Sequence, residues 1–223
     1  MVLQSAPDQR KFYIQCNEET MELYDKIVEV MLNKGIFSRP PILNPKSNNH
    51  FITNNDYIKR WVGRQRPLNA VEINGLCFNA QKLMVKIVLE MGFGQVTTSK
   101  ELRQYFQKGS LLCQKQVKTL DAILARDNLP SPKKWESEIT NSTTPPFSDR
   151  LMLFHVVSLV SSAAGFYGAA LSVVQRRDLA VMYARLIGQI GLYAENGINI
   201  MIKKGWLEQP PLAEDRKKLA NKK

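Results

Sequence analysis

The sequence contains few of the residues on which metal and nucleophilic chemistry depends. Only two histidines, His50 and His155, occur in 223 residues, and no Glu-x-x-His motif is present. A di-metal site in a helical bundle needs inward-facing glutamates together with Glu-x-x-His on two of the helices. We therefore expect neither a di-iron oxidase nor an iron store, and we predict no metal or other cofactor.

Motifs of other enzyme classes are missing as well. The sequence has no nucleophile elbow, no P-loop and no dinucleotide-binding fingerprint. Four glutamates are the candidates for interior carboxylates: Glu72, Glu90, Glu101 and Glu195. Because four carboxylates without histidine partners are a thin set of ligands, we predict a protein without enzymatic activity.

Cysteine is scarce and widely spaced. Cys16, Cys77 and Cys113 form no C-x-x-C pair, so neither a disulfide framework nor a structural zinc site is expected. Cys77 and Cys113 lie in apolar helical stretches, where buried free thiols are the default. Residues 1–17 are polar and lack the apolar segment of a signal peptide. These features predict a reducing, cytoplasmic compartment.

Acidic residues are outnumbered by basic ones, 20 against 31, which gives a formal net charge of +11. The basic residues are scattered, and the densest group lies in residues 216–223. No RNP motif and no basic recognition helix is visible, and we interpret Arg60, Trp61, Arg64 and Arg66 as ordinary surface. We predict no specific nucleic-acid partner, with salt-sensitive binding to nucleic acid or anionic lipid as an alternative.

No long apolar run is free of polar interruptions. The most apolar stretch, residues 151–174, has the length of a membrane span but contains His155, four serines and two glycines. We predict a buried bundle helix and no membrane span. Glycine inside a helix costs about 1 kcal/mol relative to alanine, so we expect a neighbouring helix to approach this stretch closely.

Helical periodicity is the main pattern that is present. It predicts long helices over residues 18–34, 68–91, 99–126, 148–174 and 178–204, and a short helix over 56–62. Gly92 and Gly94 are expected to break the second of these, and Thr98 or Ser99 and Ser148 to cap the next two. Prolines place a long loop at residues 128–147, across one end of the bundle. We predict an all-α, up-down four-helix bundle with one extra N-terminal helix.

The ends of the first and last long helices are alike. Residues 31–41 read MLNKGIFSRPP and residues 201–211 read MIKKGWLEQPP, with five identities. The residues of this signature are Gly35, Pro40, Pro41, Gly205, Trp206, Pro210 and Pro211. Helix-stop chemistry explains the glycines and prolines but not the shared methionine and lysine. Because Met201 lies 170 positions after Met31, we predict an internal repeat of about that length.

The repeat divides the chain into four parts. Residues 1–41 are the last helix and exit loop of a first repeat, 42–66 a linker with a short helix, 67–213 a complete four-helix bundle, and 214–223 a basic tail. Most of the first copy is then missing, as in a truncated two-bundle protein. A helix without its bundle must pack on the remaining bundle, pair with a second chain or stay partly mobile. We predict a homodimer, or another protein partner, through the N-terminal helix.

One group of polar residues is a candidate site. His155 is the single histidine of the predicted bundle, and we interpret it as a hydrogen-bonded core residue. Tyr167, Tyr183 and Tyr193 are expected to share a core polar cluster with it. A small apolar ligand or a degenerate metal centre at this cluster is the alternative function.

Several segments resemble a known family: PFSDRLM at 146–152, YGAAL at 167–171, RDL at 177–179, YAENG at 193–197 and GWLEQPPLAEDR at 205–216. They are similar to an uncharacterised family of endospore-forming bacteria, related to spore-coat proteins, whose members resemble ferritin-like bundles in two tandem repeats. The likeness extends from about residue 23 onward. It implies a ferritin-like bundle without the ferritin metal ligands, and it carries no established catalytic residues. Our leading hypothesis is a non-enzymatic structural or interaction protein of the spore or spore coat.

Overall fold

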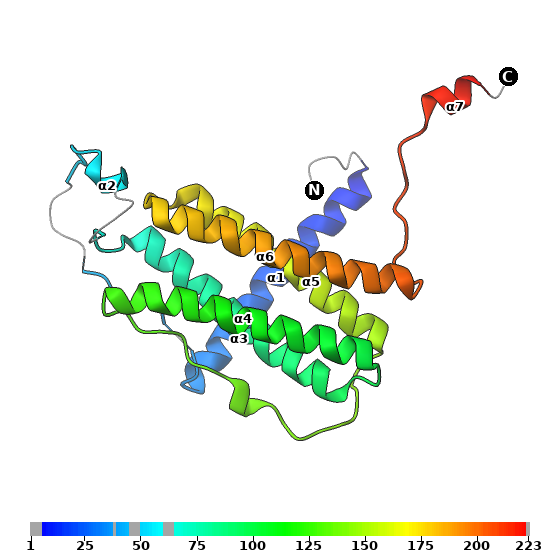
Figure 1. Cartoon of the computed structure of the whole chain (residues 1–223), viewed down its shortest axis with the longest axis horizontal. Helices are drawn as coiled ribbons and strands as arrows, with labels where there is room; N and C mark the ends of the chain where they lie inside the picture. Colours follow the sequence, from blue (N-terminus) through cyan, green and yellow to red (C-terminus); the bar gives the residue numbers. More distant parts are fainter. Residues whose placement is uncertain (1–5, 38, 45–49, 60–64, 222–223) are drawn as a thin grey trace. The chain divides into compact units, whose positions relative to one another are not determined.

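The chain folds into α-helices and connecting loops, which confirms the all-α prediction. The computed structural model describes residues 6–37, 39–44, 50–59 and 65–221, and no strand occurs among them. Contacts divide the chain into two units, residues 1–40 and residues 41–223. Figure 1 shows the order of the helices along the chain.

The first unit is built around one long helix. α1 spans Pro7–Asn33, and none of its residues is buried. It begins eleven residues before the predicted start, because Pro7 fits a first helical turn and nothing in the polar stretch that follows breaks the helix. Its apolar residues recur at steps of three and four and form one stripe. The apolar stripe consists of Phe12, Tyr13, Cys16, Leu23, Tyr24, Ile27 and Met31.

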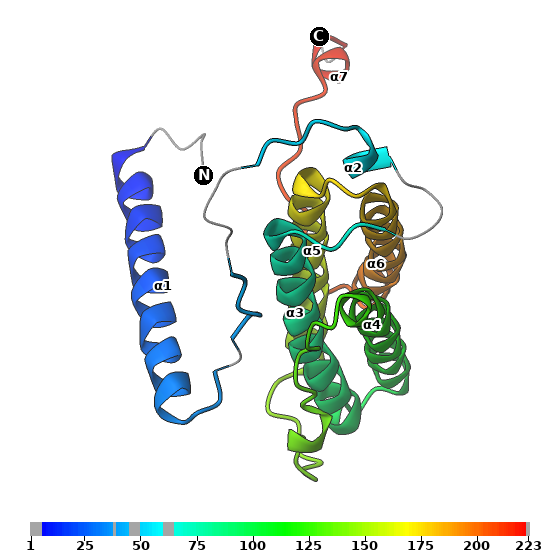
Figure 2. The same ribbon diagram turned by 90° about the vertical axis from the view of Figure 1, so that its left-hand side faces the viewer.

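The second unit contains a bundle of four long helices. They are α3 (Ala70–Val96), α4 (Lys100–Arg126), α5 (Asp149–Val173) and α6 (Arg177–Lys203). Helix α3 contacts α4 and α5, and α6 contacts α5 and α4 (Figure 2). Each helix is antiparallel to the neighbours that it contacts. The short elements of this unit are α2 (Asp56–Lys59), the 3-10 turn η1 (Glu136–Glu138) and α7 (Arg216–Ala220).

The connection from α4 to α5 crosses the whole length of the bundle. At one end, the Leu68 amide before α3 donates to Asp127 Oδ2, which follows α4, at 2.6 Å. At the other end, Thr97 after α3 donates to Asp149 at the start of α5, also at 2.6 Å. The loop therefore runs beside α3 rather than across one end as we predicted (Figure 1). The Gln95 amide holds it by donating to the carbonyls of Thr140 and Ser142.

Side-chain caps define most of the bundle helix starts. Asn69 and Glu72 form a reciprocal capping box at α3, and Ser99 and Ser148 cap α4 and α5 as predicted. The predicted break at Gly92 and Gly94 is wrong: α3 continues to Val96. A glycine costs helix stability but does not forbid a helix, and Phe93 between the two glycines is buried in the core.

The glycine-rich part of α5 is open rather than closely packed. Among the described residues of the second unit, no atom would lie within 4 Å of a Cβ added at Gly165 or Gly168, so no bundle helix makes the expected close approach. Among the described residues, α5 is the one helix long and apolar enough to cross a membrane, which is weak evidence for a span. Only 28% of its apolar window is buried, so the prediction of a buried bundle helix is wrong for most of this stretch. Its inner face is buried in the core through Met152, Leu153 and Val156.

Candidate functional site

Four polar side chains from three helices meet inside the bundle. We call Lys86 and Glu90 of α3, Tyr105 of α4 and Tyr193 of α6 the interior polar cluster. The Lys86 amine forms an ion pair with the Glu90 carboxylate, and both side chains are almost fully buried. The Tyr193 hydroxyl donates to Glu90 Oε1 at 2.9 Å. Buried charges are tolerated when they are paired and hydrogen-bonded, and Glu90 Oε1 meets this condition. The second carboxylate oxygen, Glu90 Oε2, is buried without a hydrogen-bond partner.

Two glycines make room for the two tyrosines of this cluster. A Cβ at Gly109 would lie 2.2 Å from the Tyr193 hydroxyl, and a Cβ at Gly197 would lie 2.3 Å from the Tyr105 hydroxyl. Each glycine follows a tyrosine by four residues on its own helix. Helices α4 and α6 are antiparallel, so each tyrosine covers the glycine of the other helix.

Burial dominates the electrostatics of the cluster. It raises the pKa of Glu90, and the nearby Lys86 amine offsets part of that effect. It also raises the pKa of Tyr105 and Tyr193, with the Glu90 carboxylate adding to the rise. The Cys113 thiol, 3.6 Å from Lys86 Nζ, has a pKa raised to about 12 by burial, so it is a poor nucleophile near neutral pH.

A second buried hydrogen-bond chain crosses the bundle. The Tyr167 hydroxyl donates to Gln116 Oε1 at 2.8 Å, and the Gln116 amide donates to Gln189 at 3.2 Å. The ring of Tyr183 lies 5.9 Å from that of Tyr167. This chain therefore ties α4 to α5 and α6 through buried polar contacts.

Glu72 organises one end of the bundle. Its buried carboxylate accepts two hydrogen bonds from Arg66 at 2.7 and 2.8 Å, and others from the backbone amides of Asn69, Gln175 and Arg176. Burial by itself would raise the pKa of Glu72, but the Arg66 contacts and the amides hold it below its ordinary value. Arg66 is thus half-buried and structural, whereas Arg60, Trp61 and Arg64 lie outside the described residues.

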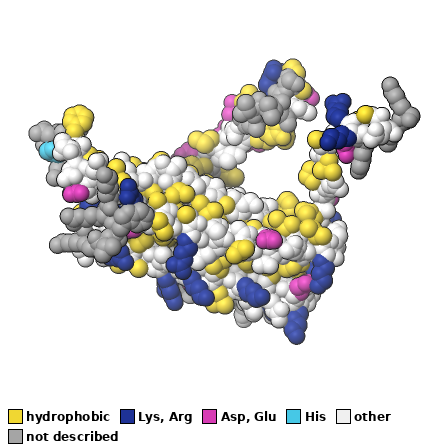
Figure 3. Space-filling model, turned by 45° about the horizontal axis from the view of Figure 1, so that its top comes forward, with side chains coloured by type: hydrophobic (Ala, Val, Ile, Leu, Met, Phe, Trp, Pro, Cys, Tyr) yellow, Lys and Arg dark blue, Asp and Glu magenta, His cyan; other side chains and the backbone are white. Residues whose placement is uncertain are grey.

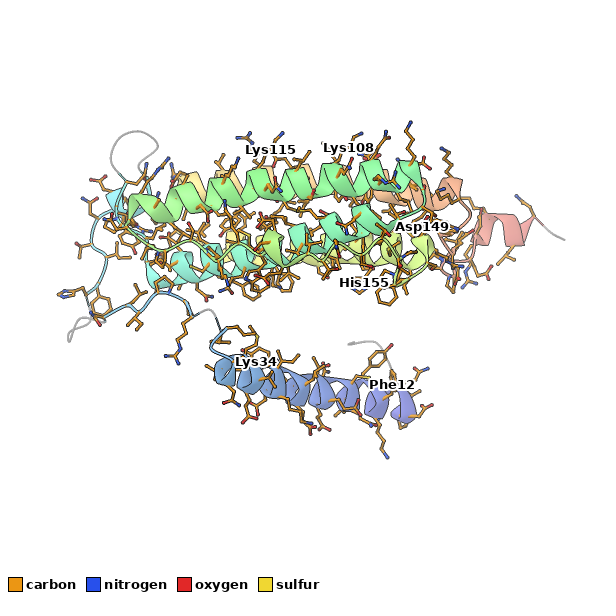
Figure 4. All side chains as sticks on the ribbon, turned by 90° about the horizontal axis from the view of Figure 1, so that it is seen from below. Phe12, Lys34, Lys108, Lys115, Asp149 and His155 are labelled. Carbon is orange, nitrogen blue, oxygen red and sulfur yellow. The ribbon has the colours of Figure 1, made fainter. Side chains whose placement is uncertain are left out.

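The predicted cluster around His155 is corrected by the structure. His155 is exposed on α5 and points away from the interior (Figure 4). The prediction failed because the outer face of α5 also carries apolar residues, which we interpreted as part of the core. The three predicted tyrosines are buried but separated. Tyr193 belongs to the interior polar cluster, while Tyr167 and Tyr183 pack together elsewhere. Of the predicted interior carboxylates, Glu72 and Glu90 are buried, while Glu101 is half-buried and Glu195 exposed.

The two helix exits of the predicted repeat have the same backbone geometry. Gly35 and Gly205 both have φ +66, where glycine is favoured. The Ile36 amide donates to the Met31 carbonyl at 2.9 Å, and the Trp206 amide donates to that of Met201 at 2.8 Å. Trp206 packs partly buried against the core. Of the prolines that follow, Pro41 is half-buried, while the others are exposed: Pro40, Pro210 and Pro211.

The interior polar cluster has no ligand set for a metal ion. Among the described residues, no three histidine, cysteine, aspartate or glutamate side chains are grouped for coordination. Lys86 neutralises the one carboxylate of the cluster. The sequence pattern pointed to Glu90 but missed Lys86, because a lysine is normally placed on the solvent side of a helix. Its spacing of four residues before Glu90 was the available signal.

The comparison with family models identifies the chain. The model of the DUF3231 family, described as a protein of unknown function, matches residues 7–48 and 56–219. The chain belongs to the DUF3231 family. The match includes α1 as well as the bundle, so both units are part of the family pattern. None of the curated proteins compared matches the chain.

A solved structure shares the fold of this DUF3231 member. It is the crystal structure of a candidate spore coat protein from Bacillus halodurans C-125, with a TM-score of 0.59 and 18% sequence identity. The similarity covers 67% of this chain and 98% of that chain. At this identity the likeness establishes the helical fold.

Proposed function

We propose that this protein is a non-enzymatic structural or interaction protein associated with the spore coat. The observation that carries the proposal is the exposed apolar stripe of α1. Tyr24 is 64% exposed and Ile27 is 48% exposed, although both occupy the apolar side of an amphipathic helix. A helix of this type gains most of its stability from packing that side against a partner. The described residues bring no three metal-ligating side chains together, which supports a role without metal chemistry.

The sequence register of α1 supports its origin as a bundle helix. Both α1 and α6 have 27 residues, and α6 follows α1 by 170 positions. Helix α6 has seven buried residues, and the positions 170 residues earlier lie on α1. Five of these seven positions belong to the apolar stripe, and the other two are Gln9 and Thr20. The five are Tyr13, Cys16, Leu23, Ile27 and Met31. We infer that α1 is the last helix of a first ferritin-like repeat.

A second copy of the chain is the partner that we propose for α1. Helix α1 carries six acidic and three basic residues, which gives it a net charge of −3. Because the whole chain has a formal net charge of +11, the rest of the chain carries +14. Lys108 and Lys115 project from α4, and lysine and arginine side chains gather along one edge of the bundle (Figures 3 and 4). Opposite charges steer association and favour the correct partner.

Sedimentation velocity tests this pairing. The wild-type chain should form a dimer, and Ile27→Glu should convert it to a monomer by placing a carboxylate in the apolar stripe. Lys26→Gln changes the net charge by the same amount outside the stripe and should leave the dimer intact. A wild-type mass of one chain at every concentration would overturn the proposal.

Spore fractionation tests the location. The protein should be extracted with the coat layers of purified spores and be absent from vegetative cells. Detection in vegetative cells alone would contradict a coat role, whatever the oligomeric state.

A further inference from the structure

We propose that the groove between α3 and α5 binds a small aromatic carboxylate, with the ring in the groove and the carboxylate on Lys82. The two helices lie side by side (Figure 2). Between them is a cavity of about 180 Å³, lined by side chains that include Leu83, Leu159, Ala163 and Phe166. We call it the α3–α5 groove. The proposal concerns the bundle by itself and does not depend on the partner of α1.

The apolar lining and the size of the groove favour one aromatic ring. An engineered apolar cavity of about 150 Å³ in another protein stays dry and binds benzene. The α3–α5 groove is of similar volume and is open on one side, so a ring can enter without unfolding. Phe166, which lines the groove, is 37% exposed, and its ring meets that of Phe78 edge to face at 5.4 Å. A bound ring would cover the exposed part of Phe166.

Lys82 supplies the charge that selects a carboxylate. Its amine lies 2.6 Å from the ring centroid of Phe166 and 4.1 Å from that of Phe78. No carboxylate among the residues that the structure describes is within ion-pair distance of Lys82. Burial lowers the pKa of this amine to about 8, which leaves most of it charged at pH 7. A partly desolvated cation that contacts only ring faces gains from an anionic partner.

The neighbouring lysine, Lys86, is not free to bind the ligand carboxylate. Lys86 also lines the groove, but its amine is paired with Glu90 in the interior polar cluster. One unpaired cation at the rim therefore matches one carboxylate, while the apolar floor gives a highly charged or purely polar anion little to bind. The matching ligand has one ring and one negative charge, as benzoate does.

Titration of the full chain with sodium benzoate at pH 7 tests the site, with methyl chemical shifts of Leu83, Leu159 and Ala163 as the readout. Saturable shifts with a dissociation constant on the order of 1 mM are expected for so small a ligand. Benzyl alcohol, which has the ring without the charge, and acetate, which has the charge without the ring, should each bind at least about tenfold more weakly. Equal binding of benzoate and benzyl alcohol would remove the role of Lys82.

Two variants separate charge from shape. Lys82→Met keeps the length of the side chain and should weaken benzoate binding about tenfold. Lys118→Met removes an exposed lysine of α4, which does not line the groove, and should leave the benzoate affinity unchanged. Ala163→Leu fills the groove and should abolish the shifts while the amide spectrum stays folded. Benzoate affinity unchanged in both Lys82→Met and Ala163→Leu, or no saturable shift in the millimolar range, would overturn the proposal.

Discussion

Tyr105 and Tyr193 stack with their ring centroids 4.4 Å apart and their planes 5° from parallel. The Tyr105 hydroxyl donates to the Tyr193 carbonyl at 3.2 Å, and the Tyr193 hydroxyl lies at the same distance from the Tyr105 carbonyl. The two tyrosines join α4 to α6 beside the buried ion pair of Lys86 and Glu90. Its geometry depends on the absence of a side chain at Gly109 and Gly197.

Substitution of these glycines is the first prediction. Gly109→Ala and Gly197→Ala should each lower the free energy of unfolding by about 1–3 kcal/mol, because the added methyl group overlaps a buried tyrosine. Urea unfolding followed by circular dichroism measures the change.

Two open glycines provide matched controls for that experiment. A Cβ at Gly92 of α3 or Gly188 of α6 meets no atom within 4 Å. Alanine at either position should stabilise the protein by about 0.5–1 kcal/mol through helix propensity. If all four variants gain stability, the tyrosine contacts do not constrain the core.

The second prediction concerns the buried ion pair of Lys86 and Glu90. Glu90→Gln leaves the Lys86 ammonium buried without its counter-charge and should cost about 3–5 kcal/mol. Lys86→Met combined with Glu90→Leu removes both charges and should cost clearly less than Glu90→Gln. Denaturant unfolding of the three proteins makes the comparison. A double variant at least as unstable as Glu90→Gln would show that the pair itself contributes the stability.

Acid should weaken the bundle end that Glu72 organises. The pKa of Glu72 is lower in the folded protein than in the unfolded chain, so the unfolded state binds more protons as the pH falls. The stabilising contribution is complete above the ordinary pKa of glutamate, about 4.3, and is lost as the pH falls through the lowered folded value. The free energy of unfolding should therefore drop more between pH 6 and pH 3 in the wild type than in Glu72→Gln. Parallel slopes for the two proteins would contradict this.

Lys82 should also make stability rise with pH, but in an alkaline window. Its folded pKa of about 8 lies below the ordinary lysine value of about 10.4, so folding penalises the charged amine. The penalty is complete below pH 8 and is relieved as the pH rises toward 10.4, so this residue makes stability increase over that window. Comparison of the wild type with Lys82→Met, which lacks the titrating amine, isolates the slope. Direct observation of the Lys82 amine by NMR gives the pKa itself.

Local capping chemistry made parts of the fold predictable from the sequence. Ser99 and Ser148 cap their helices, and Gly205 ends α6 with positive φ, because each effect depends on a few neighbouring residues. Two glycines in α3 were misjudged, since the helix-breaking effect of Gly92 and Gly94 is outweighed by packing of the residues around them.

The candidate site was less predictable because its members are chosen by three-dimensional packing. His155 lies among apolar residues at helical steps, yet the side of α5 that carries it is open. Val71 is an apolar residue of α3, yet it is 50% exposed. In contrast, Lys86 is buried because it pairs with Glu90 one helical turn away and lies against the ring of Tyr193 on α6. Only knowledge of which helices are neighbours distinguishes these cases.

The long connection between α4 and α5 divides the bundle into two helix pairs, α3–α4 and α5–α6. Residues 97–99 join α3 to α4 and residues 174–176 join α5 to α6, so each pair is a local helical hairpin. Contacts close in sequence form before distant ones because less chain entropy is lost. The bundle of the second unit therefore consists of two helical hairpins that pack against each other, and the connection from α4 to α5 links them covalently. Cleavage within residues 127–148 would leave both halves intact and make their association depend on concentration.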